Sequence, residues 1–163
     1  MAAVANSEVI KHLVVLIADS RPHSRALLRS MLLQLDVKKI HEVVDGTAAL
    51  DAIVAVNPDV MILDWDLPGR SARDVLRMAR SPTANPNPDL PIIVLSSSGQ
   101  SAYVHEAIEL GAPYFLVWPI SPKMLQQRFL GIVAEARNVA RAFRRRNLAA
   151  ARGNGTALET ARS

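Results

Sequence analysis

The sequence predicts a doubly wound α/β domain with a five-stranded parallel sheet and an extended C-terminal helix or arm. Short, continuous apolar runs recur along the chain, and such runs are typical of parallel strands buried on both faces. Segments with helical periodicity separate the runs, as βαβ units require. The chain of 163 residues shows no internal repeat and no second apolar core, so one domain is expected.

Five segments are predicted to be strands because they are short, rich in Val, Ile and Leu, and bounded by turn-forming residues. In chain order they are residues 12–18, 39–44, 60–64, 92–95 and 115–117. Residues 1–11 precede the first strand and are predicted to be a flexible N-terminus.

Five helices are expected between and after the strands. They are predicted at about 22–35, 47–56, 72–80 and 102–110, with a last helix from residue 122. Ser20, before Arg21 and Pro22, signals the first helix start, and Gly111 is the expected C-cap of the fourth helix. In the first helix Leu27 and Leu33 are assigned to the apolar stripe, and in the third helix Arg73, Arg77 and Arg80 are predicted to be exposed. The proline-rich segment 81–91 is predicted to be a surface loop.

Composition excludes several classes of site. The chain has no cysteine, so disulfides, thiolate zinc sites and cysteine nucleophiles are ruled out. The four histidines are scattered, which argues against a histidine metal site. No apolar run approaches the roughly 18 residues of a membrane span, and no signal-peptide pattern is present, so we expect a cytoplasmic protein without membrane insertion.

The charge is divided unevenly along the chain. Residues 1–136 contain 12 Lys or Arg and 14 Asp or Glu, whereas residues 137–163 contain seven Arg and one Glu. The basic character therefore belongs to the C-terminal extension, and the body is slightly acidic. A localised basic arm indicates an anionic partner.

The carboxyl ends of the predicted strands carry the polar residues. In a doubly wound sheet these ends meet at one crevice, which here would gather Asp19, Ser20, Asp64, Ser96 and Trp118. Taken alone, Asp64 has the simpler interpretation of a strand-end carboxylate that caps a loop. Paired carboxylates also suit Mg²⁺, and an Asp beside Mg²⁺ can accept a phosphoryl group.

Four segments, LVVLIADS, LDWDLPG, PIIVLSS and GAPYFLVWPIS, resemble response-regulator receiver domains of the CheY-like type over about residues 12–135. The resemblance implies the flavodoxin/CheY-like fold and signal transduction without enzymatic activity of its own. It assigns the following roles: Asp64 as phosphoacceptor, Asp19, Asp64 and the backbone carbonyl of Asp66 as Mg²⁺ ligands, Ser96 as the hydroxyl that binds the phosphoryl group, and Phe115 as the aromatic that swings inward on activation.

The chain departs from this family pattern at two positions. Ser20 stands where the family usually has a second acid, which weakens the metal site by one charge. Trp118 stands at the lysine that would pair with the phosphoryl oxygens, and an indole offers only one neutral donor. We therefore expect weak Mg²⁺ binding and weakened phosphoryl transfer, while the Trp118–Pro119 bond keeps a cis geometry.

The helical pattern continues beyond the family's usual end, so that residues 12–136 form the receiver-like domain and 137–163 an arginine-rich extension. This helix is predicted to end after Arg152, at Gly153-Asn154-Gly155. Arg137, Arg141, Arg144, Arg145 and Arg152 fall on one side of it, and Arg146 points elsewhere. Repeated guanidiniums three and four residues apart repel each other unless an anion joins them. The simpler interpretation is a solvated or unfolded basic tail.

Three anions are candidates for the arm. Nucleic acid would use the arginines on phosphates, but the arm is short and has few aromatics. An acidic membrane surface would require a stronger apolar face. A guanine-bearing second messenger fits best, because Arg reads guanine O6 and N7 as a fork.

Degenerate switch residues followed by an arginine-rich extension resemble the CheY-like cyclic di-GMP effectors of flagellated bacteria. That resemblance implies cyclic di-GMP binding by Arg137, Arg141, Arg144, Arg145, Arg146 and Arg152, an arm that orders on binding, and docking of the body on the flagellar motor switch. The alternative is an Asp64-phosphorylated response regulator in a histidine-kinase two-component phosphorelay, such as chemotaxis. Nucleic-acid binding is less favoured, and dimerisation through the last helix is disfavoured because the arm lacks sustained heptads.

Overall fold

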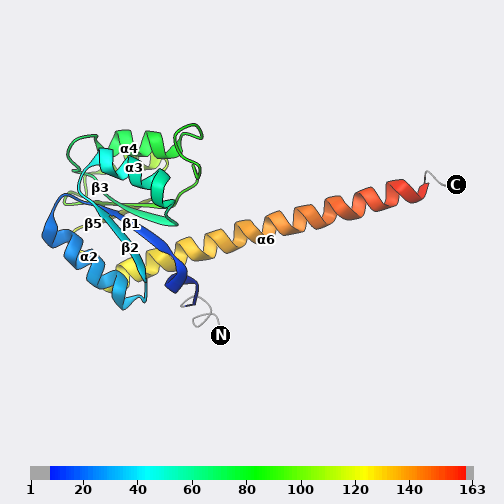
Figure 1. Ribbon diagram of the computed structural model, residues 1–163, viewed down its shortest axis with the longest axis horizontal. Helices are drawn as coiled ribbons and strands as arrows, with labels where there is room; N and C mark the ends of the chain where they lie inside the picture. The colour runs from blue at the N-terminus through cyan, green and yellow to red at the C-terminus, as the bar shows by residue number, and fades with distance from the viewer. Residues whose placement is uncertain (1–7, 161–163) are drawn as a thin grey trace.

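The computed structural model describes residues 8–160, apart from the side chains of 137–139, 143 and 153–160. It confirms the predicted fold, a five-stranded parallel sheet in the order β2-β1-β3-β4-β5 (Figure 1). The strands are β1 (Val14–Ala18), β2 (Lys39–Val43), β3 (Val60–Asp64), β4 (Ile92–Ser96) and β5 (Tyr114–Val117). The helices are α2 (Pro22–Gln34), α3 (Gly46–Val56), α4 (Ala72–Arg80), α5 (Ser101–Glu109) and α6 (Pro122–Thr160).

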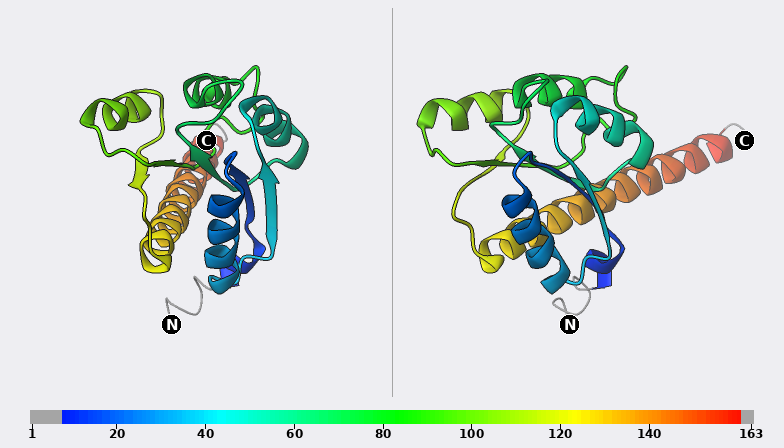
Figure 2. Two further views of the ribbon diagram at one scale, coloured as in Figure 1. Left: turned by 90° about the vertical axis from the view of Figure 1, so that its left-hand side faces the viewer. Right: turned by 60° about the vertical axis from the view of Figure 1, so that its left-hand side comes forward.

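Helices cover both faces of the sheet, as Figure 2 shows, with α2 and α6 on one side and α3, α4 and α5 on the other. Side-chain alternation along the strands produces this arrangement. In β1, Val15 and Ile17 enter the apolar cluster beneath α2 and α6, whereas Leu16 and Ala18 enter the cluster on the opposite face. Both faces of the central strands are therefore buried, which explains their unbroken apolar sequence.

The start of the chain differs from the prediction. Residues 8–12 are helical rather than a flexible lead-in, because Ile10 is buried in the cluster beneath α2 and α6. The first strand begins at Val14, whose backbone N donates to the Asp59 carboxylate at 2.8 Å. The rest of the predicted flexible N-terminus, residues 1–7, lies outside the described part of the chain.

The first helix, α2, begins one residue later than a Ser20 cap would require. Arg21 is its N-cap residue, without a side-chain capping bond, and Pro22 takes the first turn. The stripe that packs on the sheet is Leu28, Met31 and Leu32, while Leu27 and Leu33 are exposed. The apolar residues of this helix extend over more than one face, so their spacing alone did not define the buried side.

Arg80 does not project into solvent as predicted. Its guanidinium is half-buried and donates to the carbonyl oxygens of Gly111, Pro88 and Leu90 at 2.6–2.9 Å. Burial lowers the pKa of this guanidinium below its ordinary value. Arg80 therefore fixes the proline-rich loop and the turn at Gly111, which adopts a positive φ of 87° as the C-cap role requires.

The last helix is longer than predicted. It begins at Pro122, where the Ser121 hydroxyl accepts from the Met124 backbone N, and runs without a break to Thr160. The predicted end at Gly153-Asn154-Gly155 is therefore wrong, since each glycine costs a helix interior only about 1 kcal/mol. The 39 residues make α6 about 58 Å long, and its C-terminal half projects from the body alone (Figure 1).

The start of α3 fits tightly against the loop that follows β3. Gly46 donates to the Pro68 carbonyl at 3.1 Å, and a Cβ at this position would stand 2.0 Å from the Arg70 carbonyl oxygen. Asp45 caps the helix by accepting from the Ala48 backbone N at 2.8 Å. The close approach of Gly46 to Pro68 and Arg70 fixes the loop that follows Asp64, so the chain needs glycine at position 46.

Replacing Gly46 by Ala should destabilise the domain by about 3 kcal/mol, because the new methyl group collides with rigid backbone. The matched control is Gly131→Ala in α6, where a Cβ would meet nothing within 4 Å. That change should stabilise the helix by about 1 kcal/mol. Urea unfolding of both variants measures the difference, and equal effects would contradict the proposed collision.

Candidate functional site

The candidate site lies at the carboxyl edge of the sheet, where three central strands end side by side. Asp19 directly follows β1, Asp64 is the last residue of β3, and Ser96 is the last residue of β4. All three side chains are buried, with exposed fractions of 1%, 2% and 0%. The structure thus brings together the acids and the hydroxyl that the sequence assigned to one crevice.

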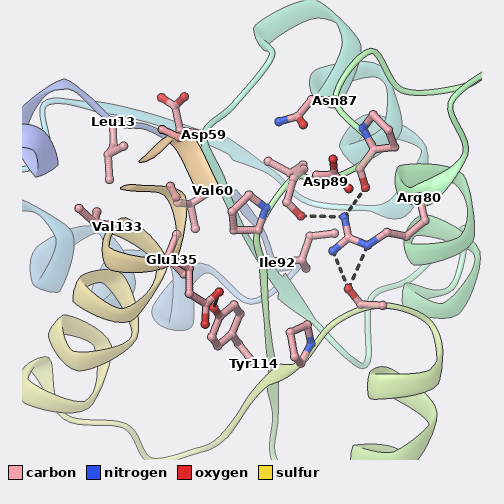
Figure 3. Close-up of a pocket in the computed structure, with 18 of the residues that line it drawn as sticks. Leu13, Asp59, Val60, Arg80, Asn87, Asp89, Ile92, Tyr114, Val133 and Glu135 are labelled. Atoms are coloured by element: carbon pink, nitrogen blue, oxygen red, sulfur yellow. Dashed lines mark hydrogen bonds between the residues drawn. The ribbon is translucent and has the colours of Figure 1, made fainter. Parts of the chain in front are cut away.

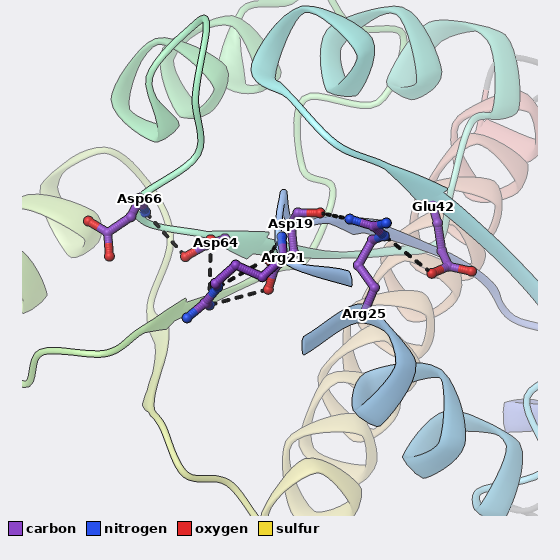
Figure 4. A network of polar contacts seen from close by, with 6 residues as sticks. All are labelled: Asp19, Arg21, Arg25, Glu42, Asp64 and Asp66. Atoms are coloured by element: carbon purple, nitrogen blue, oxygen red, sulfur yellow. Dashed lines mark hydrogen bonds and ion pairs between the residues drawn. The ribbon is translucent and has the colours of Figure 1, made fainter. Parts of the chain in front are cut away.

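Arg21 joins the two buried carboxylates (Figure 4). Its Nε and Nη2 donate to the two Asp19 oxygens at 3.3 Å each, and Nη2 also lies 3.5 Å from Asp64 Oδ2. The Arg21 backbone N donates to Asp19 Oδ1 at 2.8 Å. The sequence analysis did not predict that Arg21 pairs with both acids. The available signal was a cation two residues after Asp19, next to the serine that replaces an acid.

A second arginine supports the same turn from α2. Arg25 Nη1 donates to the backbone carbonyl of Asp19 at 2.8 Å, and its Nε lies 3.6 Å from Glu42 Oε1 on β2. Arg29, one turn further along, pairs with the same Glu42 carboxylate at 3.3 Å. These contacts position the loop that carries Asp19 but do not reach the carboxylates of the site.

Electrostatics make Asp64 unlike an ordinary surface acid. Burial, followed by repulsion from the Asp19 carboxylate, raises the pKa of Asp64 to about 6. A hydrogen bond from the Asp66 backbone N and the charge of Arg21 act in the opposite direction. Burial also disfavours the charged form of Arg21, but the bonds to Asp19 and the charges of Asp64 and Asp19 raise its pKa overall.

The predicted metal ligands, as arranged, do not fit a divalent cation. Carboxylate oxygens are the correct donor type for Mg²⁺, but the Arg21 guanidinium bridges the two carboxylates that would hold it. Asp66 turns its carboxylate away from Asp64 (Figure 4). Among the described residues, no three His, Asp or Glu side chains gather as a metal-binding group.

The hydroxyl residues have different surroundings. The Ser96 Oγ accepts from the Ser98 backbone N at 3.1 Å, which orders the loop after β4 at the edge of the site. Ser20 is half-buried beside Asp19 and supplies no charge. The role of Ser96 in binding a phosphoryl group remains a prediction from the family resemblance.

Phe115 belongs to an aromatic group that begins directly after Asp64. Its ring is half-buried and packs edge-on against Trp65, with ring centroids 6.3 Å apart, and Trp65 in turn contacts Tyr103 at 5.8 Å. The Arg73 guanidinium lies over the Trp65 ring at 4.6 Å and forms a two-pronged ion pair with Glu106. This group, absent from the sequence prediction, ties α4 to α5 beside the acidic site.

Trp118, at the position where the family resemblance implies a lysine, is partly buried. Its ring packs against the apolar cluster beneath α2 and α6, and its Nε1 is buried without a hydrogen-bond partner among the described residues. The predicted cis bond to Pro119 is present. Trp118 therefore brings no charge to the acidic site, and the cation that pairs with Asp64 is Arg21.

The arm carries a separate charged surface. Arg141, Arg144, Arg145, Arg146 and Arg152 are all exposed on α6, whereas the side chain of Arg137 lies outside the described residues. Arg141, Arg144 and Arg145 make no hydrogen bond or ion pair within the described part of the chain. These three lie at helical spacings of one, three and four residues, which sets at least two of their guanidiniums on one side of the helix.

A cavity of about 750 Å³ lies at the opposite, amino-terminal edge of the sheet (Figure 3). Its walls are largely apolar and come from the start of β3, the proline-rich loop, β5 and α6. Tyr114 donates to Glu135 across it, and burial together with this bond raises the pKa of Tyr114 to about 12. The cavity is separated from Asp64 by the length of β3, so it is not part of the acidic site.

Fold and site together define an α/β module with a pair of buried acids at its carboxyl edge. Residues 15–130 match the family model of the response regulator receiver domain, and the chain therefore belongs to that family. Within the described residues no helix is both long enough and apolar enough to cross a membrane.

Individual relatives agree with this assignment. The chain is 30% identical to the chemotaxis protein CheY of Thermotoga maritima, over 66% of the chain and 87% of the relative, and 26% identical to CheY of Pseudomonas aeruginosa. It is 33% identical to a protein-glutamate methylesterase/protein-glutamine glutaminase of Myxococcus xanthus but spans only 38% of that protein.

Solved structures show the same fold. A putative response regulator from Chloroflexus aurantiacus, 27% identical, superposes with a TM-score of 0.68 and covers 75% of this chain and 98% of its own. A Francisella response regulator receiver domain, 23% identical, gives the same TM-score with 77% and 99% coverage.

Replacing Asp64 by Asn should raise the free energy of unfolding at pH 7.5 by about 2 kcal/mol, because it removes a disfavoured buried charge. The folded protein holds a proton on Asp64 up to about pH 6, whereas the unfolded chain releases it near pH 4. Wild-type stability should therefore fall as pH rises through this window. Urea unfolding from pH 4 to 8 measures the gap between variant and wild type, which should close toward pH 4; a constant gap would contradict the raised pKa.

Proposed function

We propose that this protein is a cytoplasmic, receiver-like signalling protein that binds cyclic di-GMP through its arm and docks on a protein partner such as the flagellar motor switch. The observation that carries the proposal is the group of exposed guanidiniums of Arg141, Arg144 and Arg145, which have no partner among the described residues. Arg146, Arg152 and the undescribed Arg137 extend the same segment.

The arm is unfavourable as a lone helix. Like charges three and four residues apart destabilise a helix by about 0.2–0.5 kcal/mol per pair, and an isolated helix is marginal in water. No acidic side chain of the described residues is paired with Arg141, Arg144 or Arg145. The arm is already helical to Thr160, so a ligand with two phosphates would stabilise this helix by offsetting the repulsion rather than order it.

Arginine chemistry supports a guanine dinucleotide rather than a simple phosphate. The extension contains seven Arg and no Lys, and a guanidinium can pair bidentately with both a phosphate and the guanine O6/N7 edge. From Arg141 to Arg152 the helix rises about 17 Å, a length that suits a small dinucleotide. Nucleic acid is a weaker candidate because the arm has little aromatic surface on which bases could stack. A membrane surface is also weaker, because among the described side chains of the arm Leu148 is the one large apolar residue that is exposed.

The proposed output rests on the family. Two of the relatives named above are chemotaxis proteins of the CheY type. Docking of the body on a cytoplasmic signalling protein such as the flagellar motor switch is consistent with a role in chemotaxis. Trp118 packs against the core and supplies no charge to the acidic site, where Arg21 is already paired with Asp64. Because cyclic di-GMP would bind on the arm, this signal would need no phosphoryl transfer at Asp64.

Titration calorimetry of the full chain with cyclic di-GMP tests the binding. Replacing Arg141, Arg144 and Arg145 together by Ala should weaken binding at least a hundredfold, because each good Arg–guanine pair contributes about 1–3 kcal/mol. Arg128→Ala, an exposed arginine earlier on the same helix, should leave the affinity unchanged.

Cyclic di-AMP is the matched ligand control, since it has the same phosphates but lacks the guanine O6. It should bind at least tenfold more weakly. Absence of heat with cyclic di-GMP would end the proposal, and equal binding of both dinucleotides would reduce it to phosphate recognition.

A second candidate is a response regulator phosphorylated on Asp64 by a histidine kinase. The observation in its favour is the retained placement of Asp64 and Ser96 at the ends of adjacent strands. Incubation with acetyl phosphate and Mg²⁺ should then add one phosphoryl mass to wild type but not to Asp64→Asn, as measured by intact-protein mass spectrometry. An unmodified wild type would exclude this candidate.

A further inference from the structure

We infer that Arg21 is the resident counter-ion of the acidic site and holds the position between Asp19 and Asp64 that a divalent cation would otherwise take. The site is therefore closed to divalent metal while the guanidinium is in place. This inference goes beyond the proposed function and does not depend on the arm.

The geometry places Arg21 between the two carboxylates rather than beside one of them. The guanidinium forms a two-pronged pair with Asp19 at 3.3 Å and extends one nitrogen to 3.5 Å from Asp64 Oδ2. The backbone N of Arg21 holds Asp19 Oδ1 at 2.8 Å, so the same residue fixes the carboxylate from two sides. A metal ion that used both acids would have to displace this side chain.

Charge balance requires such a cation. Two carboxylates with 1% and 2% exposure lie at adjacent strand ends, and like charges in a buried site disfavour ionisation of both. Arg25, the other nearby arginine, reaches only the Asp19 backbone carbonyl and Glu42. Arg21 alone among the described residues pairs with both acids, and it reduces the charge of this pair from −2 to −1.

Ser20, which supplies no charge, and Arg21, which supplies a positive one, act in the same direction. Each lowers the negative potential that would attract a divalent cation. Arg21 also replaces, from the β1 side, the positive charge that Trp118 does not supply from the β5 side. The site is thus neutralised in part before any ligand or modification arrives.

The Arg21 side chain can leave the site. It is 44% exposed, whereas both of its partners are buried, so a rotation into water would uncover the acid pair without unfolding the domain. The two-pronged pair with Asp19 opposes that rotation. Arg21 therefore acts as a competitor that any metal ion must overcome.

Titration with Mn²⁺, followed by electron paramagnetic resonance of the free ion, tests the inference directly. Arg21→Gln should bind Mn²⁺ at least tenfold more tightly than wild type, because the two carboxylates lose their competing cation. Arg29→Gln removes the same charge from the adjacent helix α2, where Arg29 pairs with Glu42 and not with the carboxylates of the site, and it should bind like wild type. Adding Asp19→Asn to Arg21→Gln should abolish the gain, which assigns the metal to this site.

Thermal unfolding gives an independent readout. Without metal, Arg21→Gln should melt below wild type, since two buried acids are left unpaired. Addition of Mn²⁺ should restore much of that loss in the variant but change wild type little. If Arg21→Gln does not fold, Arg21→Lys keeps a charge without the fork, and tighter Mn²⁺ binding than wild type is then expected.

Equal Mn²⁺ affinity of wild type and Arg21→Gln would overturn the inference, as would a gain in Arg29→Gln of the same size. In the lysine variant, affinity no tighter than wild type would also overturn it. None of these measurements involves cyclic di-GMP, so failure here leaves the proposed function unaffected, and failure of dinucleotide binding leaves this inference unaffected.

Discussion

The carboxyl edge of the sheet is organised around two buried carboxylates at the ends of adjacent strands and the guanidinium that joins them. Parallel pairing of β1 with β3 forces Asp19 and Asp64 together, because both acids directly terminate apolar strands in matched register. Two such charges cannot remain ionised in a buried site without a cation. The turn after β1, the start of α2 and the pair formed by Arg25 and Glu42 all serve to hold Arg21 where that charge is needed.

What the sequence predicted correctly was encoded locally. The strands and the Gly111 turn depend on neighbouring residues, so each could be located without knowing the fold. The acid pair followed from topology, because the carboxyl ends of parallel strands share one edge. The directions of long side chains were not predictable in this way. Arg80 and Trp118 turn inward only because carbonyls and an apolar cluster from distant segments receive them.

Body and arm differ in how far their charges are satisfied. On the body, arginines such as Arg21, Arg73 and Arg80 pair with acids or carbonyls and stabilise the tertiary structure. On the arm, Arg141, Arg144 and Arg145 are exposed and pair with no residue that the structure describes. Unsatisfied charge costs a protein helix stability, so a segment that retains it is better explained by a ligand than by folding. This contrast, rather than the net charge, separates the structural arginines from the candidate binding arginines.

The two sites lie at opposite ends of the molecule. Helix α6 starts beside the carboxyl edge, where Asp64 lies, and passes the amino-terminal edge near Ala140 before it leaves the body. From Leu125 to Ala140 it rises about 22 Å, so a ligand on the arm cannot touch the acidic site. Any coupling between them must pass through α6 itself, whose Phe129 and Ile132 are buried against the sheet. A helix packed this tightly moves as a rigid element, and a ligand that changes only the solvent-exposed half leaves Asp19, Arg21 and Asp64 as they are. The proposed ligand site on the arm and the acidic site are therefore structurally independent unless binding shifts the whole of α6.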